Sequence, residues 1–175
     1  MRNDAPPKRK PNRLSAFDYS SFGAYFITIC AKHRKPIFGQ VVGGGVLDAP
    51  HLVPTPYGKI VAVQLESMSH FYPDIQIEKS VVMPNHIHFI LSLTQDPSGA
   101  SGTPPPTATR SVQAVPAFVS TFKRLSNRTA HTDLWQRSYY DHVIRGRDDY
   151  DEIWQYIDNN PAKWTLDTLY TSQGE

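Results

Sequence analysis

The chain has 175 residues, which is enough for one domain with a hydrophobic core. Charged residues make up 19% and hydrophobic residues 39%, a balance that excludes a disordered chain, and no apolar run is long enough to cross a bilayer. The net charge is only +2, but residues 1–137 carry 15 Lys and Arg against 8 Asp and Glu, which favours either a nucleic-acid partner or simply a solvated basic surface.

The first part of the chain predicts an arm, a strand, a loop and a helix. Residues 1–16 are basic and contain prolines, so they predict a flexible basic arm. Residues 24–32 alternate and are rich in β-forming types, which indicates a strand. Residues 33–58 contain the glycine run 43–45 and the prolines at 50, 54 and 56, and predict a long loop with a short strand pair. Apolar residues at helical spacing then predict a helix over 59–72.

Two strands over 75–83 and 86–93 follow, joined by a turn at Pro84-Asn85, so they form a hairpin. The low-complexity stretch 95–110 predicts a mobile loop within a single domain over 17–170, with a tail over 171–175. The remaining predicted elements are a helix over 111–129, a strand over 137–145, a helix over 149–160 capped by Asp148 and Asp149, and a short helix over 162–170.

This order of elements predicts an α+β fold of the ferredoxin-like (RRM-like) type. The first six elements run β-α-β-β-α-β, which gives an antiparallel sheet with both helices on one face. The first and third strands are central in that topology. The helix over 149–160 is an addition to it.

A pair of histidines lies on the predicted third strand. His86 and His88 point to the same face, because side chains alternate along a strand with a period of two. Two imidazoles on a rigid strand are able to hold one divalent metal ion, although such histidines also occur simply hydrogen-bonded inside a fold. A metal site needs at least a third ligand.

The predicted helix over 149–160 offers the missing groups. Tyr156 and Asn160 are four residues apart, so they lie on one helical face, one turn from each other. The Asn160 carbonyl oxygen is a suitable ligand for a hard divalent ion, and the Tyr156 phenol is a potential nucleophile. The competing interpretation is core packing, because both residues belong to a stripe that also contains Ile153 and Ile157.

A tyrosine nucleophile beside a metal favours attack on a DNA phosphodiester. The phosphotyrosine link formed by such an attack conserves the energy of the phosphodiester bond, so the strand is able to be rejoined without ATP. Strand transfer is therefore favoured over simple hydrolysis. Tyr156 is preferred as the nucleophile over Tyr139, Tyr140 and Tyr150, because none of those has an amide one turn away in a clear helix. The basic residues expected to contact DNA are Lys123, Arg124 and Arg128 for the backbone, and Arg137 nearer the cleavage site.

Three motifs occur in an order that resembles one family. They are Met-Pro-Asn-His-Ile-His at 83–88, Leu-Trp-Gln-Arg-Ser-Tyr-Tyr-Asp-His at 134–142 and Tyr-Ile-Asp-Asn-Asn-Pro at 156–161. The opening Asp-Tyr-Ser-Ser at 18–21, followed by Ala-Tyr-Phe-Ile-Thr, fits as well. The chain resembles the single-tyrosine HUH transposases, and within them the REP-associated tyrosine transposases.

The resemblance implies an HUH endonuclease fold, Mg²⁺ or Mn²⁺ as the metal, and metal ligation by His86, His88 and Asn160. It implies that Tyr156 is the catalytic nucleophile, which becomes linked to a DNA 5′-phosphate. The implied substrate is single-stranded DNA with imperfect hairpins of the REP type. The implied setting is the bacterial cytoplasm, with nucleoid association through DNA, and a single cysteine agrees with a reducing compartment. A monomer is favoured over a dimer.

Two other functions stay open at the level of the sequence. The first is a non-catalytic protein that binds single-stranded or hairpin nucleic acid, for which an RRM-like sheet and a basic surface suffice. The second is a metal-dependent phosphodiesterase that uses activated water. Only a tyrosine transposase forms a covalent protein–DNA adduct, so the detection of an adduct distinguishes it from both.

Overall fold

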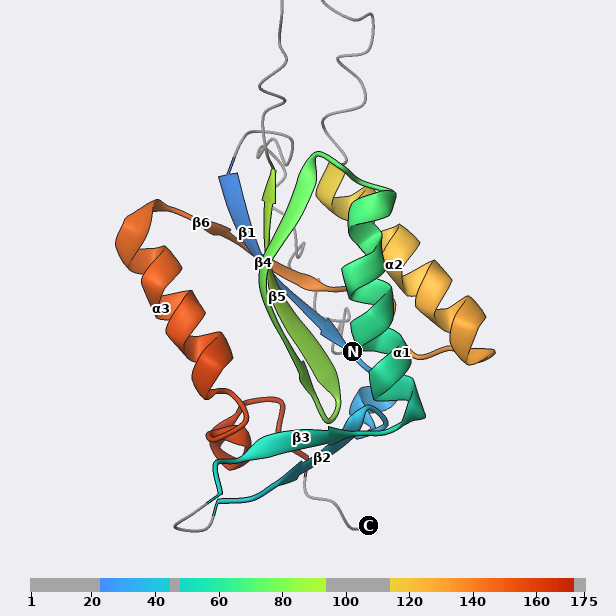
Figure 1. The fold of residues 1–175 in the computed structure, drawn as a ribbon, viewed down its shortest axis with the longest axis vertical. Helices are drawn as coiled ribbons and strands as arrows, with labels where there is room; N and C mark the ends of the chain where they lie inside the picture. The colour runs from blue at the N-terminus through green and yellow to red at the C-terminus, as the bar shows by residue number, and fades with distance from the viewer. Residues whose placement is uncertain (1–22, 45–47, 94–113, 172–175) are drawn as a thin grey trace, which may run out of the picture.

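A four-stranded antiparallel sheet forms the centre of the fold, with strand order β4-β5-β1-β6 (Figure 1). The computed structural model describes residues 23–44, 48–93 and 114–171, so the predicted basic arm, the loop over 95–110 and almost all of the tail lie outside the described residues. The strands are β1 (Gly23–Cys30), β4 (Ile75–Met83), β5 (His86–Leu93) and β6 (Tyr140–Ile144).

Helices cover both faces of this sheet. The pair α1 (Pro56–Ser67) and α2 (Ala114–Ala130) lies on one face, and α3 (Gly146–Asn159) lies on the other (Figure 1). The ferredoxin-like prediction is therefore confirmed, with the first and third strands central and α3 as the additional helix. No helix in the described part of the chain has the length and apolar character that a membrane span needs.

Hydrogen bonds between side chains and backbone amides occur at the start of two helices. Helix α1 begins three residues before the predicted start, because Pro56 occupies its first turn and the Thr55 hydroxyl accepts a hydrogen bond from the Gly58 amide at 3.2 Å. A 3₁₀ turn, η2 (Met68–His70), continues it. Helix α3 begins at Gly146, so Asp149 lies inside the first turn, where its Oδ2 accepts from the Arg145 amide at 2.8 Å.

The two faces of β5 have different roles. Ile87, Phe89 and Leu91 are buried in the main core, which fills the space between the sheet and the pair α1 and α2. Ile90 belongs to a smaller core under α3, and the two histidines share its face of the strand. The strand is therefore buried on both sides, which gives its polar side chains a fixed environment.

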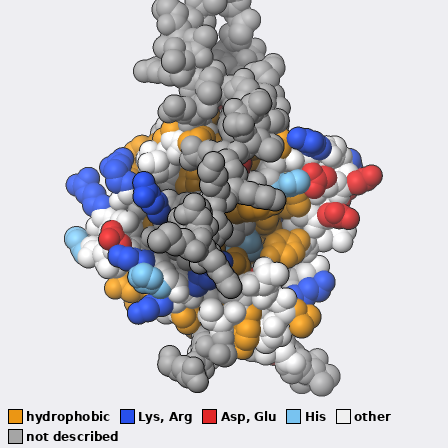
Figure 2. Space-filling model, turned by 180° about the vertical axis from the view of Figure 1, so that it is seen from behind, with side chains coloured by type: hydrophobic (Ala, Val, Ile, Leu, Met, Phe, Trp, Pro, Cys, Tyr) orange, Lys and Arg blue, Asp and Glu red, His pale blue; other side chains and the backbone are white. Residues whose placement is uncertain are grey.

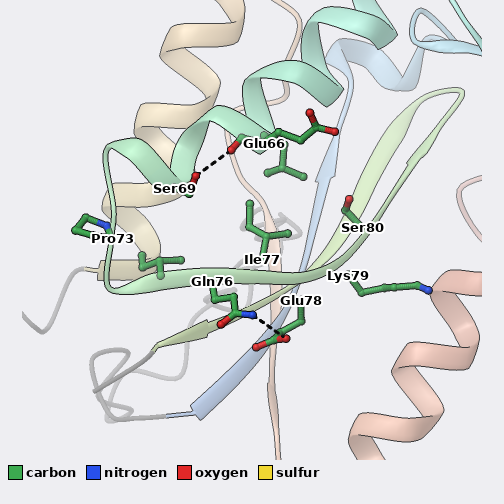
Figure 3. Close-up of a pocket in the computed structure, with 10 residues that line it drawn as sticks. Glu66, Ser69, Pro73, Gln76, Ile77, Glu78, Lys79 and Ser80 are labelled. Atoms are coloured by element: carbon green, nitrogen blue, oxygen red, sulfur yellow. Dashed lines mark hydrogen bonds between the residues drawn. The ribbon is translucent and has the colours of Figure 1, made fainter. Parts of the chain in front are cut away.

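A β-bulge in β4 changes which face of the sheet its residues occupy. The register shifts between Ile77 and Lys79, so Ile77 packs on the main core, whereas Lys79 reaches α3 (Figure 3). The Lys79 ammonium lies 2.5 Å from Asp158 Oδ1 and 4.5 Å from the ring centre of Trp154. These two contacts hold α3 along the edge strand.

A small hairpin stands apart from the main sheet, as the prediction of a short strand pair in the long loop expected. It pairs β2 (Gly39–Val42) with β3 (His51–Pro54). Just before β2, the Phe38 amide donates to the carbonyl of Pro84 at 2.9 Å. Two short 3₁₀ turns complete the described chain, η1 (Lys32–Arg34) and η4 (Trp164–Leu166).

Candidate active site

The histidine pair is buried and neutral. His86 is 0% exposed and His88 is 2% exposed, and their ring centres are 4.3 Å apart. Burial lowers the pKa of His86 to about 4, against a smaller opposing effect of the Asp167 charge. Burial, and then the neighbouring His86, holds the pKa of His88 well below its usual value. At neutral pH both imidazoles carry the lone pair that a metal ion requires.

The orientation of His86 is fixed by Asn85. The Asn85 amide nitrogen donates to the carbonyl of Arg34 at 3.2 Å and to the carbonyl of Leu169 at 2.8 Å, so its Oδ1 is the acceptor of the pair. The His86 Nδ1–H therefore donates to this oxygen at 2.8 Å. It follows that Nε2 of His86 is the unprotonated nitrogen. That atom is buried without a hydrogen-bond partner among the described residues.

His88 is held by the strand beside it. Thr28, on β1, is its direct cross-strand partner and places Oγ1 2.8 Å from His88 Nδ1. The ring of Phe26 stacks on the imidazole with centres 5.1 Å apart. These contacts leave Nε2 of His88 pointing toward α3. Outer contacts of this kind orient histidine ligands in metal sites.

The structure brings Tyr156 and Asn160 to this histidine pair. The Tyr156 hydroxyl lies 3.3 Å from Nε2 of His88, and the residue is 43% exposed, so an incoming substrate is able to reach the phenol. Asn160 is 2% exposed, and its Oδ1 has no hydrogen-bond partner within the described part of the chain. Burial, followed by the charge of Asp167, raises the pKa of Tyr156 to about 12, so the phenol is protonated at neutral pH.

One residue of the site was not predicted. Asp167 lies just after η4, and its Oδ2 accepts hydrogen bonds from the Tyr156 hydroxyl and from the Asn160 amide, both at 3.2 Å. One ligand atom each from His86, His88 and Asp167 all lie within 4.8 Å of one another. No periodic pattern marks this residue in the sequence, because it follows a proline and a 3₁₀ turn rather than continuing α3.

The donor set fits a divalent metal ion. Two buried polar atoms, Nε2 of His86 and Oδ1 of Asn160, lack partners among the described residues, and such atoms are costly unless something binds them. Imidazole nitrogens with amide and carboxylate oxygens suit ions of intermediate to hard character. The geometry therefore favours a metal ion between the histidine pair and the C-terminal end of α3.

The predicted basic residues do not converge on this site. Lys123, Arg124 and Arg128 lie on α2, which covers the opposite face of the sheet. The Lys123 ammonium donates to the carbonyls of residues 136, 137 and 138, at 2.8, 3.5 and 2.9 Å, and burial lowers its pKa to about 8. Those contacts hold the loop before β6, which explains why that strand begins at Tyr140 rather than at the predicted residue 137. Arg124, Arg128 and Arg137 are exposed.

Charge is distributed unevenly over the face of the molecule that is seen from behind (Figure 2). In the view from behind, most of the Lys and Arg side chains gather on the side of α1 and α2, whereas Asp and Glu gather beside α3 (Figure 2). A groove of about 710 Å³ between α1 and β4 is lined by Leu65, Glu66, Gln76 and Ser80 among others (Figure 3). It contains none of the site residues.

Comparison with known proteins gives a relative by sequence and a similar solved structure. No protein-family model matches the chain. A protein of Haemophilus influenzae (strain ATCC 51907 / DSM 11121 / KW20 / Rd), named only as uncharacterized, is 33% identical over 175 residues, covering 93% of each chain. The REP-associated tyrosine transposase, solved bound to a REP hairpin, superposes with a TM-score of 0.57 at 18% identity, covering 95% of this chain and 93% of that one. The chain therefore belongs to the same family as the Haemophilus influenzae protein and has the fold of the REP-associated tyrosine transposase.

Proposed function

We propose that the chain is a metal-dependent DNA transposase that cleaves and rejoins single-stranded DNA through Tyr156. The observation that carries this proposal is the position of the Tyr156 hydroxyl, 3.3 Å from Nε2 of a buried, neutral His88. An exposed nucleophile thus borders a site where His86 and Asn160 present unpartnered ligand atoms. Core packing alone would not leave two such atoms unsatisfied.

In this proposal His86, His88 and Asn160 hold one Mg²⁺ or Mn²⁺ ion. When bound, the ion would polarise a phosphate oxygen and stabilise the negative charge that develops during attack. The protein's part is to keep both imidazoles neutral and to fix their orientation. Asn85 and Thr28 supply that orientation through Nδ1 of each ring.

The covalent step is a transesterification. The Tyr156 phenol oxygen forms a bond to phosphorus, and the bond between phosphorus and the sugar 3′ oxygen breaks. The phenol loses its proton, and the leaving 3′ oxygen gains one, so the products are a 5′-phosphotyrosine link and a free 3′ hydroxyl. Rejoining is the reverse attack by a 3′ hydroxyl, which needs no nucleotide cofactor.

The proposed substrate is single-stranded DNA that folds into an imperfect hairpin. The structural neighbour was solved bound to a REP hairpin, which supports this choice. Arg124, Arg128 and Arg137 are exposed and are our candidates for phosphate contacts. Lys123 is the weaker candidate of the predicted set, because its ammonium donates within the protein. A bacterial cytoplasmic location, association with the nucleoid and action as a monomer belong to the same proposal.

Cleavage of labelled hairpin DNA tests the proposal directly. The protein is incubated with Mn²⁺ and single-stranded DNA that carries REP-type hairpins and their flanks, and the products are separated on a denaturing gel. We expect a covalent protein–DNA band, and we expect Tyr156→Phe to abolish it. Tyr57→Phe is the matched control, because Tyr57 is an exposed tyrosine at the start of α1, on the other face of the sheet, and this variant should keep full activity.

The other two candidate functions give different results in this experiment. A non-catalytic binder would shift the hairpin DNA on a native gel, with neither cleavage nor an adduct, and Tyr156→Phe would bind as the parent protein does. A phosphodiesterase that uses water would cleave without an adduct. Full activity of Tyr156→Phe would overturn the assignment of the nucleophile.

A further inference from the structure

We infer that Asp167 is an additional ligand of the metal ion, so that the segment after α3 completes the site. This inference rests on the proposed function, because it concerns the same ion. Asp167 contributes one of three ligand atoms that lie within 4.8 Å of each other, the others coming from His86 and His88. Ligands on opposite sides of an ion with bonds of 2.0–2.2 Å are roughly 4.2 Å apart, so only small movements are needed to close the site.

The Asp167 carboxylate is already oriented. Its Oδ1 accepts a hydrogen bond from the Leu169 amide at 2.6 Å, which turns Oδ2 toward the site. Oδ2 accepts from Tyr156 and from Asn160, the two site residues on or just after α3. A carboxylate oxygen has two lone pairs, so Oδ2 is able to bind an ion while it keeps one of these hydrogen bonds.

The segment that carries Asp167 is tied to the strand that carries the histidines. The Asn85 amide donates to the Leu169 carbonyl at 2.8 Å and to the Thr171 hydroxyl at 3.3 Å. Trp164 is 6% exposed, and its ring centre lies 5.9 Å from that of His86. Asn85 therefore orients a histidine ligand and holds the C-terminal segment at the same time.

The charge of the ion favours Asp167 as a ligand. The three ligands already proposed are two neutral imidazoles and an amide, so without Asp167 an ion would keep its full double positive charge in a largely buried place. Hard divalent ions prefer carboxylate oxygens, and one carboxylate lowers the net charge of the site to +1. The remaining positive charge still attracts a DNA phosphate.

Metal titration of the whole protein without DNA tests the inference. The dissociation constant for Mn²⁺ is measured by calorimetry for the parent protein, for Asp167→Asn and for Asp151→Asn. We expect Asp167→Asn to weaken binding by at least about tenfold. Asp151→Asn is the matched control, because it removes the same charge from the surface of α3, where Asp151 pairs with Arg147, and its affinity should not change.

A second readout separates ligation from folding. The visible absorption of bound Co²⁺ reports the ligand set, so it should change in Asp167→Asn, while the unfolding temperature of the metal-free variant shows whether the fold is kept. Equal Mn²⁺ affinity and an unchanged Co²⁺ spectrum in Asp167→Asn would overturn the inference alone. If the parent protein bound no metal at all, both this inference and the metal site of the proposed function would be overturned.

Discussion

At the scale of single residues, the Asn85 side chain joins the two parts of the site through its hydrogen bonds. Its oxygen sets the tautomer of His86, and its nitrogen reaches the segment after α3. We expect Asn85→Ala to lower the affinity for Mn²⁺ by roughly 10–100-fold, because an outer contact that orients a ligand is lost. Calorimetry checks this. Asn159→Ala, an exposed asparagine on the last turn of α3, should bind Mn²⁺ as the parent does, and equal binding by Asn85→Ala would contradict the assigned role.

The buried histidines give the metal-free protein a defined dependence on pH. The pKa of His86 is about 4 in the folded protein against 6.5 for a solvated histidine, and the pKa of His88 is also lowered. Between these values the unfolded chain binds more protons than the folded chain, so the free energy of unfolding falls as the pH is lowered from about 6.5 toward 4. Urea unfolding with a chelator present measures this slope. His86→Gln should reduce it, and an unchanged slope would mean that His86 is not the group responsible.

At the scale of elements, regular patterns were predictable and irregular ones were not. Alternation along 86–93 placed the two histidines on one face, and the helical spacing of Tyr156 and Asn160 placed those two together, because both arguments use a fixed period. The bulge between Ile77 and Lys79 breaks the period, so nothing in the sequence indicated that Lys79 would face α3. Asp167 was not predicted as a site residue for the same reason, because its position depends on how the chain turns back after Pro161.

The contact between β4 and α3 leads to a prediction about that helix. Lys79→Met keeps the length of the side chain but removes the ion pair with Asp158 and the cation over Trp154. The pair is partly exposed, so we expect a loss of about 1 kcal/mol or less in the free energy of unfolding. The substitution should increase the rate of amide hydrogen exchange more in α3 than in β5. Lys59→Met, an exposed change on α1, is the control, and an equal change in both elements would argue against a local role.

At the scale of the whole molecule, the basic side chains and the candidate active site lie in different places. On the face seen in Figure 2, the basic side chains gather on the side of α1 and α2. Tyr156 and the two histidines lie on the other face of the sheet, which α3 covers (Figure 1). DNA that contacts both regions would have to pass around an edge of the sheet. A folded hairpin with single-stranded flanks has the length to do so, with its duplex and its flank in different regions.

The 3.3 Å approach of Tyr156 to His88 occurs within one polypeptide. In the proposed function each chain therefore carries its own full set of reacting groups, and the rate of cleavage per chain should stay constant as the protein is diluted. Mixing Tyr156→Phe with His86→Ala gives a sharper form of the same prediction. Two inactive variants should fail to rescue each other, whereas restored cleavage in the mixture would show that neighbouring chains exchange their tyrosine-bearing helices.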